Sequence, residues 1–161
     1  MEIRFANYLD LEQVIRLEQE NFSPEEQISE AVLENYLLHL HHTCLVMEKD
    51  GVVAGYLLAS PSSSATVTDE IFHLDSGHLP RGEYLSIASL SVSATFQGQG
   101  VGTLLLAAIK EVALAKGVKG IALTCKESLI NYYELNQFED KGMSQSQFGG
   151  KEWYDMFWKS L

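Results

Sequence analysis

Positive charge is scarce in this sequence. Its 161 residues include 11 lysines and arginines against 22 aspartates and glutamates, so the formal net charge is −11. Nucleic-acid backbones and anionic membrane surfaces attract basic proteins, and we therefore expect neither as a partner. A cationic substrate would suit this charge, although solubility alone explains it equally well.

Cysteine is nearly absent as well. Cys44 and Cys125 stand in separate apolar runs with no second cysteine nearby. This pattern argues against a disulfide framework and a structural zinc site, so we expect reduced thiols in the core. The histidine cluster offers no metal site either, because His39, His41 and His42 do not share one helix face and have no carboxylate or thiol beside them.

Long apolar runs are also missing. No stretch approaches the ~20 residues that cross a bilayer, and the segment after Met1 lacks the basic and apolar regions of a secretory signal. We therefore expect a soluble, cytoplasmic protein. No repeat or linker divides residues 1–161, so we expect a single domain that is large enough to bury its own core.

The apolar patterns that are present alternate between the periods of strands and helices. Strand patterns cover residues 2–6, 43–49, 52–59, 83–92, 118–125, 138–143 and 153–158, and helix patterns cover 10–21, 29–40, 68–72, 101–116 and 129–135. This order predicts an α/β (α+β) fold with a mixed, mostly antiparallel sheet of about seven strands and helices on both faces. The helix at 101–116 should cross over to a parallel neighbouring strand.

Two of these segments carry local signals. Asp10 followed by Gln13 resembles a capping box, and the helix that it opens places Glu18 on the same face as Val14 and Ile15. Asp50-Gly51 separates two apolar strand patterns and predicts a tight hairpin.

Glycine is concentrated in one loop. Gln97-Gly98-Gln99-Gly100-Val101-Gly102 joins the strand at 83–92 directly to the helix at 101–116. Several backbone N–H groups therefore meet at the positive end of a helix dipole, where an anion is favoured. Because glycine has no Cβ to keep a phosphate away and can take a positive φ, pyrophosphate is the expected ligand. A plain tight turn is the alternative, but such a turn rarely needs three glycines so close together.

Two better-known phosphate motifs do not fit this loop. A Walker loop requires Gly-Lys-Ser/Thr, whereas Gly102 is followed by Thr103-Leu104. The dinucleotide pattern Gly-x-Gly-x-x-Gly/Ala fails at its third position, which is Thr103, and the loop does not lie in an opening βαβ unit. Neither nucleotide hydrolysis nor NAD binding is supported.

The loop fits the pattern Gln/Arg-x-x-Gly-x-Gly/Ala through Gln97, Gly100 and Gly102. With the order of elements around it, the chain resembles the GNAT superfamily of acetyl-CoA-dependent N-acetyltransferases. Three further segments resemble its arylalkylamine (serotonin) N-acetyltransferase-like branch, namely residues 66–70, 123–134 and 148–153.

This resemblance implies a GNAT fold, acetyl-CoA as co-substrate, no metal, and a small-molecule primary amine as acceptor. The cofactor-binding residues that it implies are Leu90, Ser91, Val92, Gln97, Gly98, Gln99, Gly100, Val101, Gly102, Thr103 and Asn131. It also implies that Tyr133 is the general acid that protonates the leaving thiolate. A tyrosine with an ordinary pKa near ~10 is protonated at neutral pH and could serve, although Tyr132 and Tyr133 could also be simple core aromatics.

The chain departs from that branch at the histidine pair of the strand before the loop, where it has Ser86 and Ala88. Either a carboxylate such as Glu83 acts through water, or the amine arrives partly deprotonated and needs only a water chain. We expect direct transfer, with the sheet opening after Val92, a backbone N–H near Val92 stabilising the oxyanion, and no covalent intermediate.

The acceptor and the assembly stay open. Phe22, Phe72 and Phe148 could line a pocket for an arylalkylamine, while a polyamine, an antibiotic or a protein N-terminus would also fit the pattern. A non-catalytic acetyl-CoA-binding or regulatory module on the same fold is the alternative function. A homodimer is one option for the oligomeric state.

Overall fold

The computed structural model describes the whole chain, from Met1 to Leu161. Its seven strands form one sheet in the order β1-β2-β3-β4-β5-β7-β6. The strands are β1 (Glu2–Phe5), β2 (Cys44–Lys49), β3 (Val52–Ser62), β4 (Tyr84–Val92), β5 (Gly120–Cys125), β6 (Glu139–Met143) and β7 (Tyr154–Lys159). The helices are α1 (Leu11–Asn21), α2 (Glu30–His39), α3 (Val101–Lys116) and α4 (Ile130–Leu135). This architecture confirms the predicted mixed sheet.

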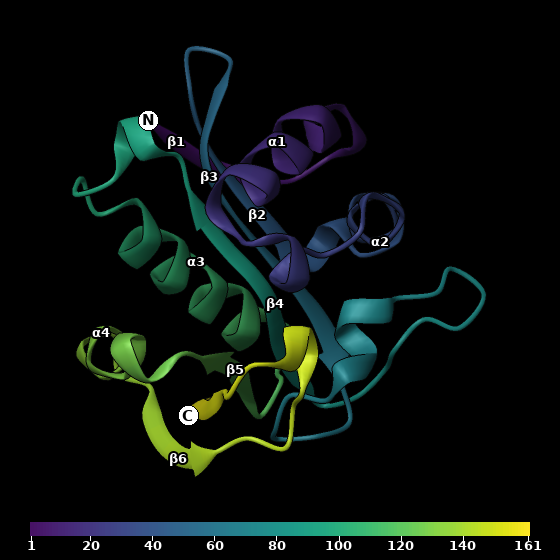
Figure 1. Ribbon diagram of the computed structural model, residues 1–161, viewed down its shortest axis with the longest axis vertical. Coiled ribbons are helices and arrows are strands. Elements are labelled where there is room, and N and C mark those ends of the chain that lie inside the picture. Colours follow the sequence, from purple (N-terminus) through teal and green to yellow (C-terminus); the bar gives the residue numbers. More distant parts are fainter.

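Helices cover both faces of the sheet, as expected (Figure 1). One buried cluster joins α1 and α2 to the sheet, with Val14, Leu33 and Tyr56 among its members. A second cluster joins α3 and α4 to the opposite face through residues such as Leu105 and Tyr133. Cys44 lies in the first cluster and Cys125 in the second, and both are buried free thiols, as predicted.

The start of α1 differs in detail from the sequence prediction. A capping box of Asn7 and Asp10 closes the 3-10 turn Tyr8–Asp10 just before α1, because the Asn7 side chain accepts from Leu9 N (2.9 Å) and Asp10 accepts from Asn7 N (2.9 Å). The predicted Asp10–Gln13 box is wrong, since the Asp10 carboxylate also binds Arg4 and the Gln13 side chain accepts from Val53 N on β3. Both side chains therefore bind partners outside α1 and do not form the predicted box.

The hairpin predicted at Asp50-Gly51 is confirmed. Both residues have positive φ, 51° and 80°, which is the geometry of a two-residue turn between β2 and β3. The strand β3 continues through Pro61 to Ser62, so the following loop begins later than the sequence suggested.

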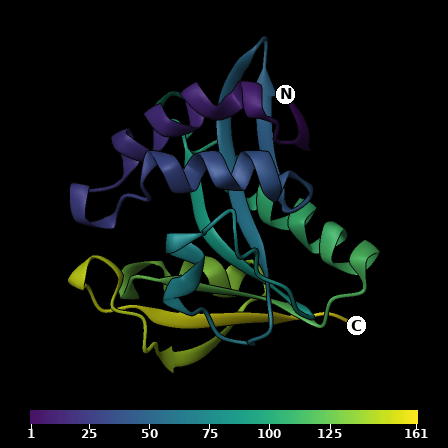
Figure 2. The ribbon, with the colours of Figure 1, turned by 90° about the vertical axis from the view of Figure 1, so that its right-hand side faces the viewer.

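The central strands β4 and β5 pair over only a short length and then separate, which opens the sheet between them. These strands are parallel, as the crossover through α3 predicted, but they pair only at Leu85–Ile121 and Ser86–Ala122. The prediction that the sheet opens after Val92 is therefore wrong, because the strands separate directly after Ser86. A bulge at Ala88, where the β3–β4 register shifts, bends β4 at this point. In Figure 2 the β7 strand crosses the lower part of the molecule while β3 rises above it.

No helix is both long and apolar enough to cross a membrane. No group of three or more His, Cys, Asp or Glu side chains is arranged to hold a metal ion.

Candidate active site

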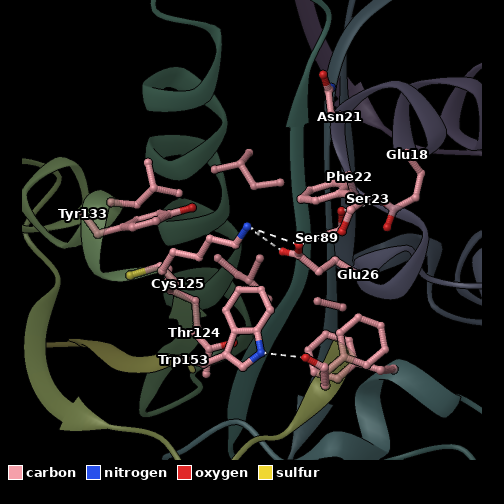
Figure 3. Close-up of a pocket in the computed structure, with 18 residues that line it drawn as sticks. Glu18, Asn21, Phe22, Ser23, Glu26, Ser89, Thr124, Cys125, Tyr133 and Trp153 are labelled. Atoms are coloured by element: carbon pink, nitrogen blue, oxygen red, sulfur yellow. Dashed lines mark hydrogen bonds and ion pairs between the residues drawn. The ribbon is translucent and has the colours of Figure 1, made fainter. Parts of the chain in front are cut away.

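A cavity of about 340 Å³ occupies the gap between β4 and β5 (Figure 3). Ile87–Leu90 on β4 and Leu123–Cys125 on β5 form its two sides, and 11 of its 18 lining residues are hydrophobic. The exposed side chains of Ser23 and Lys126 also line it, so the cavity reaches solvent. Its size and its apolar walls with few polar groups are typical of a small-molecule site.

Tyr133 on α4 presents the only tyrosine hydroxyl of this cavity. Its ring is packed against Tyr132 and Phe138, which leaves the residue 8% exposed. The hydroxyl makes no hydrogen bond with the protein, and it points into the cavity in Figure 3. Burial, with the nearby Cys125 and Tyr132, raises the pKa of this phenol, so it keeps its proton at neutral pH. It is a free donor aimed at the gap.

Glu18 on α1 is a buried carboxylate on the opposite side of the cavity (Figure 3). Its Oε1 accepts from the hydroxyls of Tyr56 (2.6 Å) and Ser89 (2.8 Å), and its Oε2 accepts from Ile28 N (2.9 Å). Burial raises the pKa of Glu18, and these three donors partly oppose that shift. The carboxylate ties α1 to β3, β4 and the chain before α2.

Glu26, in the 3-10 turn Pro24–Glu26, is a second carboxylate of the cavity. Its side chain is only 6% exposed and pairs with Lys126 Nζ at 2.9 Å, while Ser23 Oγ donates at 2.7 Å. Burial alone would raise the pKa of Glu26, but the hydrogen bonds from Lys126 and Ser23 and the charges of Lys126 and Lys151 hold it below its usual value. The group is therefore ionised at neutral pH.

Four aromatic side chains besides Tyr133 line the cavity. Phe22, Phe72 and Phe148 all line it, as the sequence suggested, and Trp153 joins them. Phe72 and Phe148 stack at 4.2 Å between centroids, and Trp153 Nε1 donates to Phe148 O at 2.8 Å. These contacts hold the rings in place.

Gly149 brings the end of this aromatic wall against Glu26. Its φ is 68°, and a Cβ there would lie 2.7 Å from the carbonyl oxygen of Glu25. Only glycine allows so close an approach, which packs the turn Phe148–Gly150 on the turn Pro24–Glu26.

The glycine-rich loop ends at an uncapped helix. Gly98 and Gly100 have φ of 78° and 79°, and the space that a Cβ would take is open at both positions. Gly100 is the N-cap of α3, no side chain caps the helix, and its first turn has no acidic residue. The first N–H groups of α3 are therefore available to an anion. Gly102 lies against the Tyr132 hydroxyl, to which a Cβ would come within 2.6 Å.

Backbone groups of β4 also face the gap. Ser93 N donates to Ala54 O on β3 (2.8 Å), so alternation along the strand directs the N–H groups of Val92 and Leu90 to the other side, where β5 has separated. The carbonyl of Val92 accepts from Asn21 Nδ2 (3.0 Å) and Gln97 Nε2 (3.3 Å). Ser91 is buried, and its hydroxyl accepts from Asn21.

Most of the remaining residues that the resemblance implied lie at the surface. Gln97, Gln99 and Thr103 are exposed, whereas Val101, the first residue of α3, is buried. Asn131 is exposed and does not line the cavity, and its predicted cofactor contact stays a prediction.

The residues considered as a general base for the acceptor amine differ in whether they line the cavity. Glu83 lies outside the cavity, where its exposed carboxylate pairs with Lys119 at 2.8 Å. Ser86 is fully buried with no partner for its hydroxyl, and Ala88 lines the cavity at the bulge. Burial raises the pKa of Cys125 to about 11, so this cavity residue is a thiol and not a nucleophilic thiolate.

Sequence reasoning missed Glu26, Lys126 and Trp153. Lys126 and Glu26 are 100 positions apart, and no local pattern marks their pairing. Glu18 did have a signal, since a carboxylate on the apolar face of a helix needs buried partners.

Comparison with known families finds that the profile of the acetyltransferase (GNAT) family matches residues 11–137. A comparison with curated proteins finds no match.

Solved structures share the fold over nearly the whole chain at low identity. The GphF GNAT-like decarboxylase in complex with isobutyryl-CoA is 17% identical with a TM-score of 0.80, covering 100% of both chains. A ribosomal-protein-alanine N-acetyltransferase from Brucella melitensis is 22% identical with a TM-score of 0.70, covering 99% of both. A diaminobutyrate acetyltransferase from Paenibacillus lautus, in complex with L-2,4-diaminobutyric acid and coenzyme A, is 15% identical with a TM-score of 0.71, covering 99% of this chain and 95% of that one.

Proposed function

The chain belongs to the acetyltransferase (GNAT) family, and we propose that it transfers an acetyl group from acetyl-CoA to a small primary amine by direct attack. The observation that carries this proposal is the gap between β4 and β5, into which the free hydroxyl of Tyr133 points. Structural neighbours in complex with coenzyme A or an acyl-CoA support the choice of an acyl-CoA as donor, and neighbours named as acetyltransferases support the reaction class.

The chain has groups that fit coenzyme A. The uncapped start of α3, with open space at Gly98 and Gly100, suits the pyrophosphate. The N–H groups of Leu90 and Val92, which face the gap, suit the amides of the pantetheine arm and the acyl oxygen. The bound coenzyme supplies the acyl group as a thioester, an acylating agent with a good leaving group.

Tyr133 acts as the general acid in this proposal. Its buried phenol keeps its proton at neutral pH and has no competing hydrogen bond, so it can donate to the sulfur as the carbon–sulfur bond breaks. Cys125 does not form an acyl intermediate, because its raised pKa keeps the thiol protonated.

The acceptor needs a route for the proton that it loses before its nitrogen attacks. Glu83 lies outside the cavity, and Ser86 and Ala88 carry no group that titrates near neutral pH. The exposed Ser23 and Lys126 line the cavity, which therefore opens to solvent, and in this proposal the ammonium form of the acceptor loses a proton to water there before its nitrogen attacks.

Release of free thiol from acetyl-CoA, measured against a panel of primary amines, tests the function. We expect release that depends on the amine and equals the N-acetyl product counted by mass spectrometry. Tight binding of acetyl-CoA without release for any amine would sink the enzyme proposal and favour the alternative, a non-catalytic acetyl-CoA-binding module.

A further inference from the structure

We propose that Glu26 binds the ammonium group of the acceptor, and that Lys126 occupies this place until the acceptor displaces it. The inference rests on the proposed function and narrows the acceptor to a cationic primary amine with an apolar body. It assigns a role to an ion pair that crosses the mouth of the cavity.

The two carboxylates of the cavity differ in what they can still bind. Glu18 accepts three hydrogen bonds from parts of the fold that cannot leave, namely Tyr56, Ser89 and the backbone of Ile28. Glu26 has one fixed neutral donor, Ser23, and its remaining partner is a lysine side chain. Only Glu26 can exchange a partner without loss of structure.

The side chain of Lys126 can leave the ion pair, whereas the side chain of Glu26 is held in place. The lysine side chain is 49% exposed and follows the last residue of β5, while the Glu26 side chain is 6% exposed and held by Ser23 at 2.7 Å. Lys126 Nζ lies 2.9 Å from Oε1 and 3.2 Å from Oε2, so a single ammonium group contacts both oxygens. A substrate ammonium has the same charge and the same three N–H donors and can replace it in kind.

The burial of the Glu26 carboxylate also favours replacement of Lys126 by another cation. An ionised group that loses its counter-charge in a largely apolar site is strongly disfavoured. When Lys126 turns to solvent, Glu26 therefore favours any cation that reaches it.

The walls define the rest of the acceptor. Phe22, Phe72, Phe148 and Trp153 line the same cavity as Glu26 and suit an apolar substituent on the amine. Aromatic faces also attract an ammonium group directly. The net charge of −11 disfavours an acceptor that carries a carboxylate.

Binding of 2-phenylethylamine to the free protein by calorimetry, with the uncharged 2-phenylethanol as a matched probe, tests this proposal without any need for turnover. We expect the amine to bind more tightly than the alcohol. Glu26→Gln should weaken amine binding by about tenfold or more and leave the alcohol unaffected. Lys126→Met should do the opposite and strengthen amine binding roughly 2- to 5-fold, because the internal competitor is gone.

Lys119→Met is the control, since it removes the lysine of the exposed Lys119–Glu83 pair outside the cavity and should leave amine binding unchanged. Thermal unfolding of each variant checks that the fold is retained. A purely structural ion pair would make Glu26→Gln and Lys126→Met act alike, and that result would overturn the proposal. So would weaker amine binding by Lys126→Met, or equal affinity for amine and alcohol.

The pH dependence gives a second readout. The titratable groups around Glu26 are Lys126 after β5, Lys151 after the turn Phe148–Gly150, its neighbour Glu25, and Glu18, which lines the same cavity from α1. Because Lys126 helps to hold the pKa of Glu26 down, Lys126→Met should move the loss of amine binding on acidification to higher pH. An unmoved acid limb would contradict the proposal.

If amine-dependent thiol release is found while Glu26→Gln changes neither amine binding nor KM, this inference fails and the proposed function stands. If no amine supports thiol release but the calorimetric pattern holds, the proposed function fails and the ammonium site stands.

Discussion

At the scale of single residues, Tyr133 combines a buried ring with a hydroxyl that has no hydrogen-bond partner in the protein. Packing against Tyr132 and Phe138 fixes the ring, and the raised pKa keeps the phenol protonated. Other buried tyrosines of the chain have their hydroxyls bonded, as Tyr56 is to Glu18 and Tyr36 is to Ile71 O. The missing partner at Tyr133 is what sets this residue apart from a core aromatic.

Tyr133→Phe should lower kcat about 100-fold while the Kd for acetyl-CoA stays unchanged, because the variant loses only the proton donor. Steady-state kinetics and calorimetry measure the two quantities. Cys125→Ala is the matched comparison, since it also alters a buried group of the cavity but should keep most of the turnover. Full activity in Tyr133→Phe would contradict a catalytic role for this tyrosine. Loss of activity in Cys125→Ala would instead favour a mechanism with an acyl intermediate on Cys125.

At the scale of elements, α3 has a left-handed glycine at each end. Gly100 precedes it with φ of 79° and Gly117 follows it with φ of 70°, and neither has an atom in the space of a Cβ. Gly117 N–H closes the C-terminus by donating to Leu114 O, whereas nothing caps the N-terminus. Backbone hydrogen bonds within the fold cap the C-terminus of α3, and in our proposal a bound ligand satisfies the free N–H groups at its N-terminus.

Gly100→Ala and Gly117→Ala should each cost about 1 kcal/mol of stability, because both place alanine at a positive φ. Only Gly100→Ala should also weaken acetyl-CoA binding, by about tenfold, since its methyl group enters the space before the α3 amides. Urea unfolding and calorimetry separate the two effects. Equal acetyl-CoA affinity in the two variants would contradict the placement of pyrophosphate at this loop.

Most elements could be predicted because their signals are local. Asp50-Gly51 specified its hairpin, and the apolar stripe of residues 101–116 specified its helix. The capping box at Asp10 and the opening point of the sheet were predicted wrongly, since Arg4 and the bulge at Ala88 act through tertiary contacts. For the site, the glycine loop and Tyr133 have signals in the sequence, whereas the pair of Glu26 and Lys126 has none.

At the scale of the whole molecule, the separated strands β4 and β5 connect two differently equipped faces. The α3 and α4 side provides an uncapped helix start and Tyr133, and the α1 and α2 side provides aromatic rings and two carboxylates. In our proposal, an anionic donor and a cationic acceptor therefore enter from opposite faces and meet in the gap. The net charge of −11 favours the approach of the acceptor.

A crystal structure with a bisubstrate analogue, in which an acetyl bridge joins the sulfur of coenzyme A to a primary alkylamine, tests the proposed function most directly. We expect the pyrophosphate at the start of α3, the sulfur beside the Tyr133 hydroxyl between β4 and β5, and the amine portion among the aromatic rings on the Glu26 side. An analogue bound outside this gap, or one with its sulfur remote from Tyr133, would contradict the proposed function.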